Sequence, residues 1–249
     1  MQAMNHNRPE IQYPRRRIIR RLLRGANGAL FRLLTRLRVE GQENLPSSGP
    51  LLVAINHFNF TDPAVVLRAV PWPIEVLGGF RQPNSPFWGG WLLGLWGHLP
   101  VHRGTGARGA LRLAETVLAQ GGVVGIAPEG GSWATVLRPP RPGAAFLAAR
   151  SRARVLPVGI HGAHNIFPSL SRGRRAQVTV RIGAPIGPFH VEERGERRRR
   201  QLDAVGHQIM QAIAGLIPPE HRGYYSDDPA LRAAAQEAAV YPWDEEIEI

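Results

Sequence analysis

The chain has 249 residues, of which 43% are hydrophobic, and this is enough for one well-packed domain with a terminal extension. It contains no cysteine, which excludes disulfides, thiolate metal sites and cysteine nucleophiles. All 31 basic residues are arginine, and the formal net charge of +12 indicates an anionic partner: phospholipid head groups, a phosphorylated substrate or cofactor, or nucleic acid. A genome that favours arginine codons would explain the absence of lysine equally well.

The N-terminal part is strongly basic. Residues 1–14 are expected to be disordered, whereas residues 15–38 hold nine arginines and no acid. Apolar residues recur at helical spacing between Ile18 and Leu37, with arginines on the other face, so residues 15–40 are predicted to form a basic amphipathic helix or helix pair. A helix of this kind can lie in a membrane interface; the alternative is a helix packed on the domain with a solvated arginine face.

The rest of the chain alternates between two patterns. Short apolar runs predict strands at 51–55, 74–78, 99–101, 122–127, 154–160 and 177–182. Helical patterns lie at 63–70, 105–120, 142–152 and 193–216. This alternation predicts a single α/β domain over 41–217, with a central mixed sheet flanked by helices. Residues 218–249 are predicted to be a loose acidic extension with a short helix at 229–239, and no stretch is apolar enough for a spanning helix.

The segment from Leu51 to Pro63 carries candidate catalytic residues. A buried strand is expected to end before Asn56, and a helix to begin at Pro63, because proline suits the first helical position. His57 then lies at a strand end and Asp62 at a helix start, so the loop can bring them together. A histidine can take a proton from a hydroxyl while a carboxylate fixes its tautomer. The simpler interpretation is that Asp62 only caps the helix.

A second strand end has a similar composition. The apolar run that begins at Gly122 ends in Pro128, Glu129 and Gly130, followed by Gly131. A glycine-rich backbone can approach a ligand closely and donate hydrogen bonds to it. Because ligands bind at the carboxyl ends of strands in α/β sheets, Glu129 and His57 are expected to share one site.

Taken in order, these segments resemble the glycerol-phosphate and lysophospholipid acyltransferase family. The matching blocks are Asn56-His57 with Asp62, then Gly79–Arg81 and Leu99–Gly104, then Pro128-Glu129-Gly130, and finally Val155–Ile160 and Val180–Ile186. The resemblance covers about residues 30–190. It implies a sheet-based α/β domain with an acyl tunnel, a lipid hydroxyl acceptor, and acyl-CoA or acyl-carrier protein as donor. No cofactor beyond this co-substrate and no metal is implied.

The resemblance also implies roles for single residues. His57 would be the general base and Asp62 its partner, with Asn56 beside them in the same block. Glu129 and Gly130 would help to hold the acceptor. Arg103 would contact the acceptor phosphate, and Arg81 occupies a position that often holds lysine.

Two departures from the family pattern bear on the acceptor. The family usually has Thr-Arg after the third-block glycine, and here Gly131 and Ser132 follow. The missing arginine is a usual phosphate ligand, so either Arg138 or Arg141 substitutes for it, or the acceptor is a larger lipid or glycolipid. Asn59 replaces a serine in the first block, a change expected to be tolerated.

Other patterns give competing hypotheses. Gly130-Gly-Ser132-Trp-Ala134 approximates the nucleophile elbow of serine hydrolases, although nearby prolines oppose the helix that an elbow needs. His161 and His164 could ligate a metal, but no third ligand is evident. The tryptophan-rich segment 87–96 suits a tunnel wall or interfacial patch as well as a buried helix. A non-enzymatic nucleic-acid binding protein is the last alternative, and it lacks a stacking or zinc motif.

The sequence thus predicts a peripheral membrane protein. The partners expected are a lipid acceptor, acyl-CoA or acyl-carrier protein, and an anionic membrane surface on the cytoplasmic side, with no nucleic acid.

Overall fold

The structure, a computed structural model, describes residues 11–79, 87–101, 107–192 and 194–240. The strands are β1 (Thr35–Glu40), β2 (Leu51–Ile55), β3 (Ile74–Gly79), β4 (Leu99–Val101), β5 (Val123–Ile126), β6 (Arg154–His161) and β7 (Ala176–Ile182). The α-helices are α1 (Arg17–Leu34), α2 (Asp62–Ala69), α3 (Phe87–Trp96), α4 (Ala107–Ala119), α5 (Pro142–Ser151), α6 (Ile166–Leu170), α7 (Gly195–Ala214) and α8 (Pro229–Ala238). Short 3-10 turns are η1 (Gln42–Asn44), η2 (Ala163–Asn165), η3 (Pro219–His221) and η4 (Gly223–Tyr225).

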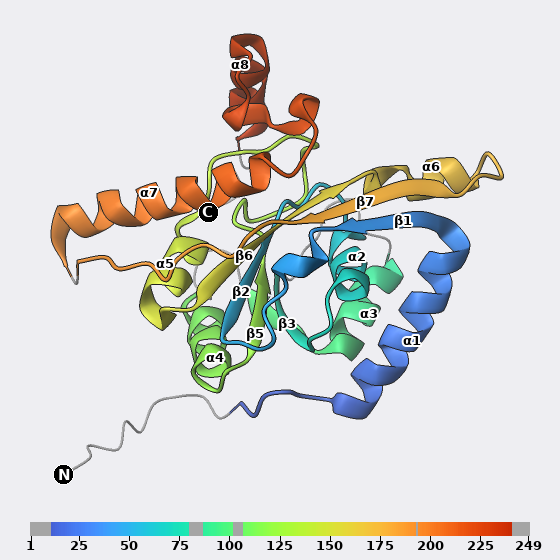
Figure 1. Cartoon of the computed structure of the whole chain (residues 1–249), viewed down its shortest axis with the longest axis horizontal. Helices are drawn as coiled ribbons and strands as arrows, with labels where there is room; N and C mark the ends of the chain where they lie inside the picture. Colours follow the sequence, from blue (N-terminus) through green and yellow to red (C-terminus); the bar gives the residue numbers. More distant parts are fainter. Residues whose placement is uncertain (1–10, 80–86, 102–106, 193, 241–249) are drawn as a thin grey trace, which may run out of the picture.

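The strands form one sheet in the order β1-β7-β6-β2-β5-β3-β4 (Figure 1). Five neighbouring strands, from β6 to β4, run parallel, while β7 pairs antiparallel with β6 and parallel with β1. The predicted α/β fold with a central mixed sheet is confirmed. Because β6, β2 and β5 are adjacent and parallel, the loops that follow them leave the same edge of the sheet.

Helices cover both faces of the sheet, which explains why the central strands are continuous apolar runs. All five residues of β2 are buried. Leu52 and Ala54 pack with α4, α5 and α7 on one face, whereas Leu51, Val53 and Ile55 pack with α1, α2 and α6 on the other.

The N-terminal helix is shorter than the predicted segment 15–40, and it is one helix rather than a pair. It ends at Leu34, and residues 35–40 form the edge strand β1, which pairs with β7. Leu37 satisfies the helical period, but Leu37 and Val39 also satisfy the alternating period of a strand. The parallel partner β7, distant in sequence, decides between the two, so the helix prediction for 35–40 was wrong.

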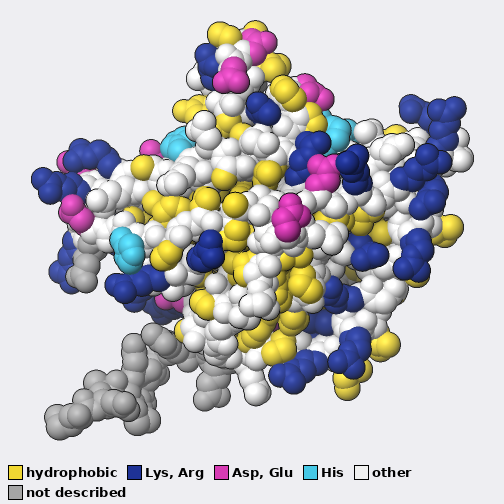
Figure 2. All heavy atoms as spheres, in the orientation of Figure 1, with side chains coloured by type: hydrophobic (Ala, Val, Ile, Leu, Met, Phe, Trp, Pro, Cys, Tyr) yellow, Lys and Arg dark blue, Asp and Glu magenta, His cyan; other side chains and the backbone are white. Residues whose placement is uncertain are grey.

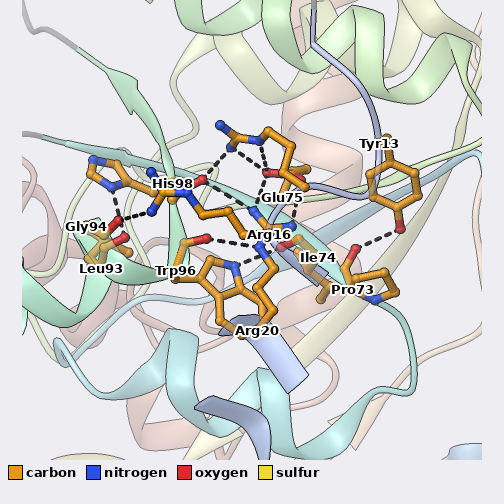
Figure 3. A network of polar contacts seen from close by, with 12 residues as sticks. Tyr13, Arg16, Arg20, Pro73, Ile74, Glu75, Leu93, Gly94, Trp96 and His98 are labelled. Carbon is orange, nitrogen blue, oxygen red and sulfur yellow. Dashed lines mark hydrogen bonds and ion pairs between the residues drawn. The ribbon is translucent and has the colours of Figure 1, made fainter. Parts of the chain in front are cut away.

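Helix α1 is held to the domain by arginines. The buried Arg20 pairs through both terminal nitrogens with the buried carboxylate of Glu75 in β3, at 2.6 and 2.7 Å, and its Nε donates to the Trp96 carbonyl at 2.9 Å (Figure 3). Arg15 also donates to Glu75, at 2.6 Å, and Arg16 donates to the Gly94 carbonyl at 2.6 Å. The carbonyls at the end of α3, which lack partners within that helix, are thereby satisfied.

With these arginines turned inward, α1 presents apolar side chains outward. Ile18 is 78% exposed, Leu22 69% and Leu33 71%, and these positions share one face of the helix. Arg17, Arg21 and Arg32 are exposed beside them. Figure 2 shows basic side chains along the right-hand edge of the view, where α1 lies, with hydrophobic ones projecting between them.

The segments at both ends of the described chain are packed on the domain. Residues 11–14, expected to be disordered, are fixed by Tyr13, whose hydroxyl donates to the Pro73 carbonyl at 2.7 Å. Residues 218–226 are not loose either, because Leu137 N–H donates to the His221 carbonyl and Tyr224 N–H donates to the Leu137 carbonyl, both at 2.9 Å. Helix α8 agrees with the short helix predicted at 229–239.

Candidate active site

The first half of the site is the loop that leaves β2. Asn56, fully buried, follows the strand directly and bonds to β6 through its side chain. Its Oδ1 accepts the Ile160 N–H at 2.7 Å, and its Nδ2 donates to the Ile160 carbonyl at 2.9 Å. The side-chain amide thus continues the pairing of β2 with β6 for one more residue, and this fixes the point from which His57 departs.

Asp62 closes the same loop from the first turn of α2. One of its oxygens, Oδ2, accepts hydrogen bonds from the backbone N–H groups of Phe58 and Asn59, each at 2.7 Å. The same oxygen lies 3.1 Å from Nδ1 of His57. The carboxylate is 1% exposed, so these donors replace its hydration. Asp62 is therefore both the brace of the loop and the partner of the imidazole.

This contact fixes how His57 can react. A carboxylate at Nδ1 favours the tautomer with the proton on Nδ1, which leaves the lone pair of Nε2 for a substrate. Among the described residues, none is hydrogen-bonded to Nε2. Asn59, which replaces the serine of the family pattern, accepts hydrogen bonds from Thr61 N–H at 3.1 Å and Thr61 Oγ1 at 2.9 Å. It forms a local turn that leads into α2.

The second half of the site is Glu129, in the turn after β5. Its carboxylate lies across the β2 loop, where Oε1 accepts the His57 backbone N–H at 3.2 Å. Its Oε2 accepts from the Arg138 side chain, Nε, at 3.1 Å and from the Arg138 N–H at 3.3 Å. Arg138 also donates to the Gly131 carbonyl and lies 3.6 Å over the ring of Trp133. Glu129 and Arg138 thus connect the two turns of the site.

Burial dominates the electrostatics of this pair. It raises the pKa of Glu129 to about 7, while the guanidinium of Arg138 and the N–H of His57 oppose the shift by stabilising the carboxylate. Gly130 has a φ of 83°, in the left-handed region that favours glycine. The exposed Arg141 lies over it, with Cγ 3.1 Å from where a Cβ on Gly130 would be.

A family model described as Acyltransferase matches residues 36–161, a range that includes both halves of this site. The chain belongs to the acyltransferase family. This confirms the resemblance to glycerol-phosphate and lysophospholipid acyltransferases that the ordered motifs predict.

The fold of this acyltransferase is similar to the crystal structure of the 1-acyl-sn-glycerophosphate (LPA) acyltransferase PlsC from Thermotoga maritima. The two chains are 22% identical, the TM-score is 0.54, and the match covers 80% of this chain and 83% of that chain.

An apolar pocket of about 280 Å³ lies beside the loop that follows β2 in this acyltransferase. It is formed by α1, α2, α3 and α6, and Phe60 and Thr61 of the loop belong to its wall. Other lining residues are Leu23, Leu30, Leu34, Leu67, Leu92, Leu93, Trp96, Ile166 and Phe167. In the tryptophan-rich segment, Leu92, Leu93 and the buried Trp96 thus line a pocket, whereas Trp91 is 65% exposed.

The remaining predicted site residues divide into three groups. Arg81 and Arg103 lie outside the described residues. Arg138, one of two candidates for the missing phosphate ligand, is 2% exposed and braces Glu129, whereas Arg141 is at the surface. Ser132 lacks the setting of a nucleophile elbow, because no helix follows until α5 begins at Pro142. Within the described chain, it makes no hydrogen bond to a histidine.

Two features of the site were not predicted. The brace between Glu129 and Arg138 crosses a loop without periodicity, so spacing gives no signal for it. The sequence gives His161 and His164 no role beyond a metal site that lacks further ligands, and the structure adds His221 from η3 to them, with ring centroids 5.1 and 5.9 Å away. In the parts of the chain that are described, no group of three or more histidine, aspartate or glutamate side chains could hold a metal ion.

Proposed function

We propose that the chain moves a fatty acyl group from acyl-CoA or acyl-carrier protein to a hydroxyl of a lysophospholipid, glycerol phosphate or related lipid. His57 acts as general base and Asp62 orients it. The observation that carries the proposal is the 3.1 Å contact between His57 Nδ1 and Asp62 Oδ2, in a loop that also forms the wall of an apolar pocket. Membership of the acyltransferase family supports it.

The reaction follows from the free lone pair on Nε2. As the acceptor oxygen attacks the thioester carbonyl carbon, the hydroxyl proton passes to Nε2, and the carboxylate of Asp62 stabilises the imidazolium. The C–S bond then breaks, and the leaving thiolate takes the proton back from the imidazolium. The products are an ester and a thiol, and the enzyme returns to its starting state without a covalent intermediate.

The apolar pocket is the proposed binding site of an acyl chain. Its lining is aliphatic and aromatic, and it lies against Thr61, the residue before Asp62. A chain in this pocket would place the adjoining carbonyl or glycerol carbon next to His57. The Asn56 bond to β6 and the Glu129 bond to the His57 N–H hold the base in place for that encounter.

We further propose that the protein works on an anionic membrane surface, on the cytoplasmic side. The exposed apolar residues of α1 lie among exposed arginines, the composition of an interfacial helix. Leu30, Leu92 and Phe167, 51%, 40% and 44% exposed, line the pocket, so its rim is apolar too. No helix in the described residues is long and apolar enough to cross a membrane.

The test is acyl transfer to lyso-acceptors in lipid vesicles, followed by thiol release. His57→Ala is expected to lower kcat/KM by about 10²–10⁴-fold, the usual value of general-base assistance. His190→Ala, at an exposed position, is the matched control and should retain full activity. Full turnover by His57→Ala would refute the mechanism. Acyl release to water without an acceptor, lost in Ser132→Ala, would support the hydrolase alternative instead.

A further inference from the structure

Three histidines from distant parts of the chain meet beside the catalytic loop. His161 ends β6, His164 lies in η2, and His221 ends η3. The ring centroids are 5.1 Å apart for His161 and His221, 5.9 Å for His164 and His221, and 6.3 Å for His161 and His164. Each ring thus contacts both others, and we call this group the histidine cluster.

The histidine cluster adjoins the site on the side of β6. The Asn56 side chain joins β2 to Ile160, so His57 and His161 are the next residues on two bridged neighbouring strands. The ring of His221 lies 5.8 Å from that of Phe58, the residue after His57. Burial and His221 lower the pKa of His164, and the carboxylate of Asp62 is near enough to oppose this shift.

Packing does not account for the three imidazoles. His221 is held by its Nδ1, which donates to the Thr135 carbonyl at 2.8 Å, and this leaves Nε2 for another partner. His161 and His164 make no side-chain hydrogen bond to any described residue, although both are only partly exposed. These imidazole nitrogens are therefore open to water or to a ligand.

The charges around the cluster indicate that an anion would bind together with protonation of the imidazoles. Burial, His221 and His164 lower the pKa of His161, with Arg181 of β7 adding to this and Glu220 of η3 opposing it. The pKa of His164 is lowered as well, by burial and by His221. An anion that bridges them favours their protonated form, and in that form both nitrogens of each ring are donors.

A phosphorylated lipid acceptor has the matching shape. Its acyl chain is at one end, its phosphate at the other, and the reacting hydroxyl between them. The catalytic loop has the same order: Phe60 faces the apolar pocket and stacks on Phe167, whereas Phe58 contacts His221. His57 directly precedes Phe58, and Asp62 follows Phe60 by two residues, so both lie next to these rings in the loop. The family resemblance implies a phosphate-binding arginine in the third block, where this chain has Gly131 and Ser132.

We propose that His161, His164 and His221 bind the phosphate of the acceptor. This inference rests on the proposed acyl transfer and specifies its acceptor. It also gives the segment after α7 a part in the reaction, since that segment supplies His221.

The test compares two acceptors that differ only in the phosphate, a lysophosphatidic acid and the matching monoacylglycerol, in vesicles of uncharged lipid. In His161→Gln/His164→Gln/His221→Gln, the KM for lysophosphatidic acid should rise about tenfold or more, because charge-assisted hydrogen bonds are lost. The kcat, the KM for acyl-CoA and the KM for monoacylglycerol should stay within about threefold. His190→Gln is the control for surface substitution.

Several outcomes would overturn the inference. An equal rise of KM for both acceptors would make the cluster a structural element, and a rise confined to acyl-CoA would assign it to the donor. Bound zinc in the wild type, lost in the triple variant, would make it a metal site. If the enzyme used monoacylglycerol but not lysophosphatidic acid, the proposed phosphate site would be refuted and the proposed acyl transfer would not. If it transferred an acyl group to no acceptor, the proposed function itself would be refuted.

A binding measurement keeps the inference testable if the triple variant does not fold. In the wild-type protein with isotope-labelled histidine, sn-glycerol 3-phosphate should shift three imidazole signals towards the protonated form, and glycerol should not. His221→Gln alone should remove one of these signals and weaken the shift of the other two. Unchanged imidazole signals at saturating glycerol phosphate would contradict the proposal.

Discussion

Two carboxylates hold the loop that carries His57, and each bonds to backbone as well as to side chains. Asp62 accepts from His57, Phe58 and Asn59, while Glu129 accepts from the backbone of His57. His57 is thus fixed at its ring and at its main chain. A substitution of either carboxylate changes the position of His57 as well as its charge environment.

At the residue scale, Arg138 is expected to matter through Glu129. Arg138→Met leaves the buried carboxylate without its cation, and losing one member of a buried pair costs about 3–5 kcal/mol of unfolding free energy. The pKa of Glu129, about 7 in the wild type against 4.5 for the model compound, should rise further. A raised carboxyl pKa makes stability fall as pH rises through it, so the variant should lose stability above pH 7.

Urea unfolding between pH 6 and pH 9 checks this prediction. Glu129→Gln added to Arg138→Met should abolish the extra pH dependence and restore part of the stability, because no charge is then buried. The prediction fails if the single and double variants show the same pH profile.

The sequence predicts only part of the site at this scale. His57 and Asp62 could be predicted because a strand end and a helix start lie within a few residues of each other. Glu129 could be placed at a second strand end, but its contacts with the His57 N–H and with Arg138 could not. The role proposed here for His161 depends on His221, which folds back from beyond α7, and no local pattern records such a contact.

At the scale of elements, α1 shows why periodicity does not determine orientation. The sequence predicts the two faces of the helix, but not which one meets the protein. Bare carbonyls at the end of α3 and the buried Glu75 attract Arg20 inward, and the exposed apolar positions turn away. The partner element, rather than the helix itself, selects the buried face.

The ion pair under α1 predicts a pH-dependent loss of stability. Burial raises the pKa of Glu75, but the hydrogen bonds from Arg20 and Arg15 outweigh it, so the folded pKa is below 4.5. A depressed carboxyl pKa stabilises the fold above the unfolded pKa, and this contribution is lost as pH falls through the folded value. Glu75→Gln should therefore cost about 3 kcal/mol or more at pH 7.

Urea unfolding in steps from pH 7 to pH 3 measures the difference between wild type and Glu75→Gln. The difference should narrow as the pH falls below about 4.5 and through the lower pKa of the folded protein, because the unfolded carboxyl binds a proton first and the paired carboxylate does so only at lower pH. Glu220→Gln, at an exposed carboxyl in η3, is the control and should change little. A difference that stays constant with pH would show that the carboxylate does not anchor α1.

At the scale of the whole molecule, the exposed residues of α1 predict how the protein meets a bilayer. Leu22→Gln should weaken sedimentation with anionic vesicles several-fold, since each buried CH₂ contributes about 0.8 kcal/mol. Val240→Gln is the matched control, because Val240 is 65% exposed against 69% for Leu22 and follows α8. Equal binding of both variants to the vesicles would show that α1 does not contact the membrane. Deleting residues 1–38 would be a poorer test, as it removes most of β1.

The overall fold was more predictable than the site. Six of the seven strands in the described residues, and α2, α4, α5 and α7, lie where the alternation of apolar runs and helical patterns places them. Local periodicity is enough for these elements because both faces of the sheet are covered. The exception, β1, lies at an edge, where one neighbouring strand decides its conformation.

The junction between α1 and β1 has a consequence for the lipid itself. The helix ends at Leu34 and the strand begins at Thr35, with no linker between them. If the outer face of α1 inserts into a bilayer, the tilt of the sheet relative to the membrane and the depth of the pocket rim in it are therefore both fixed. An acceptor could then slide sideways into the pocket with its tail never leaving hydrocarbon. Pulling a sixteen-carbon tail into water would cost roughly 12 kcal/mol, at about 0.8 kcal/mol per CH₂.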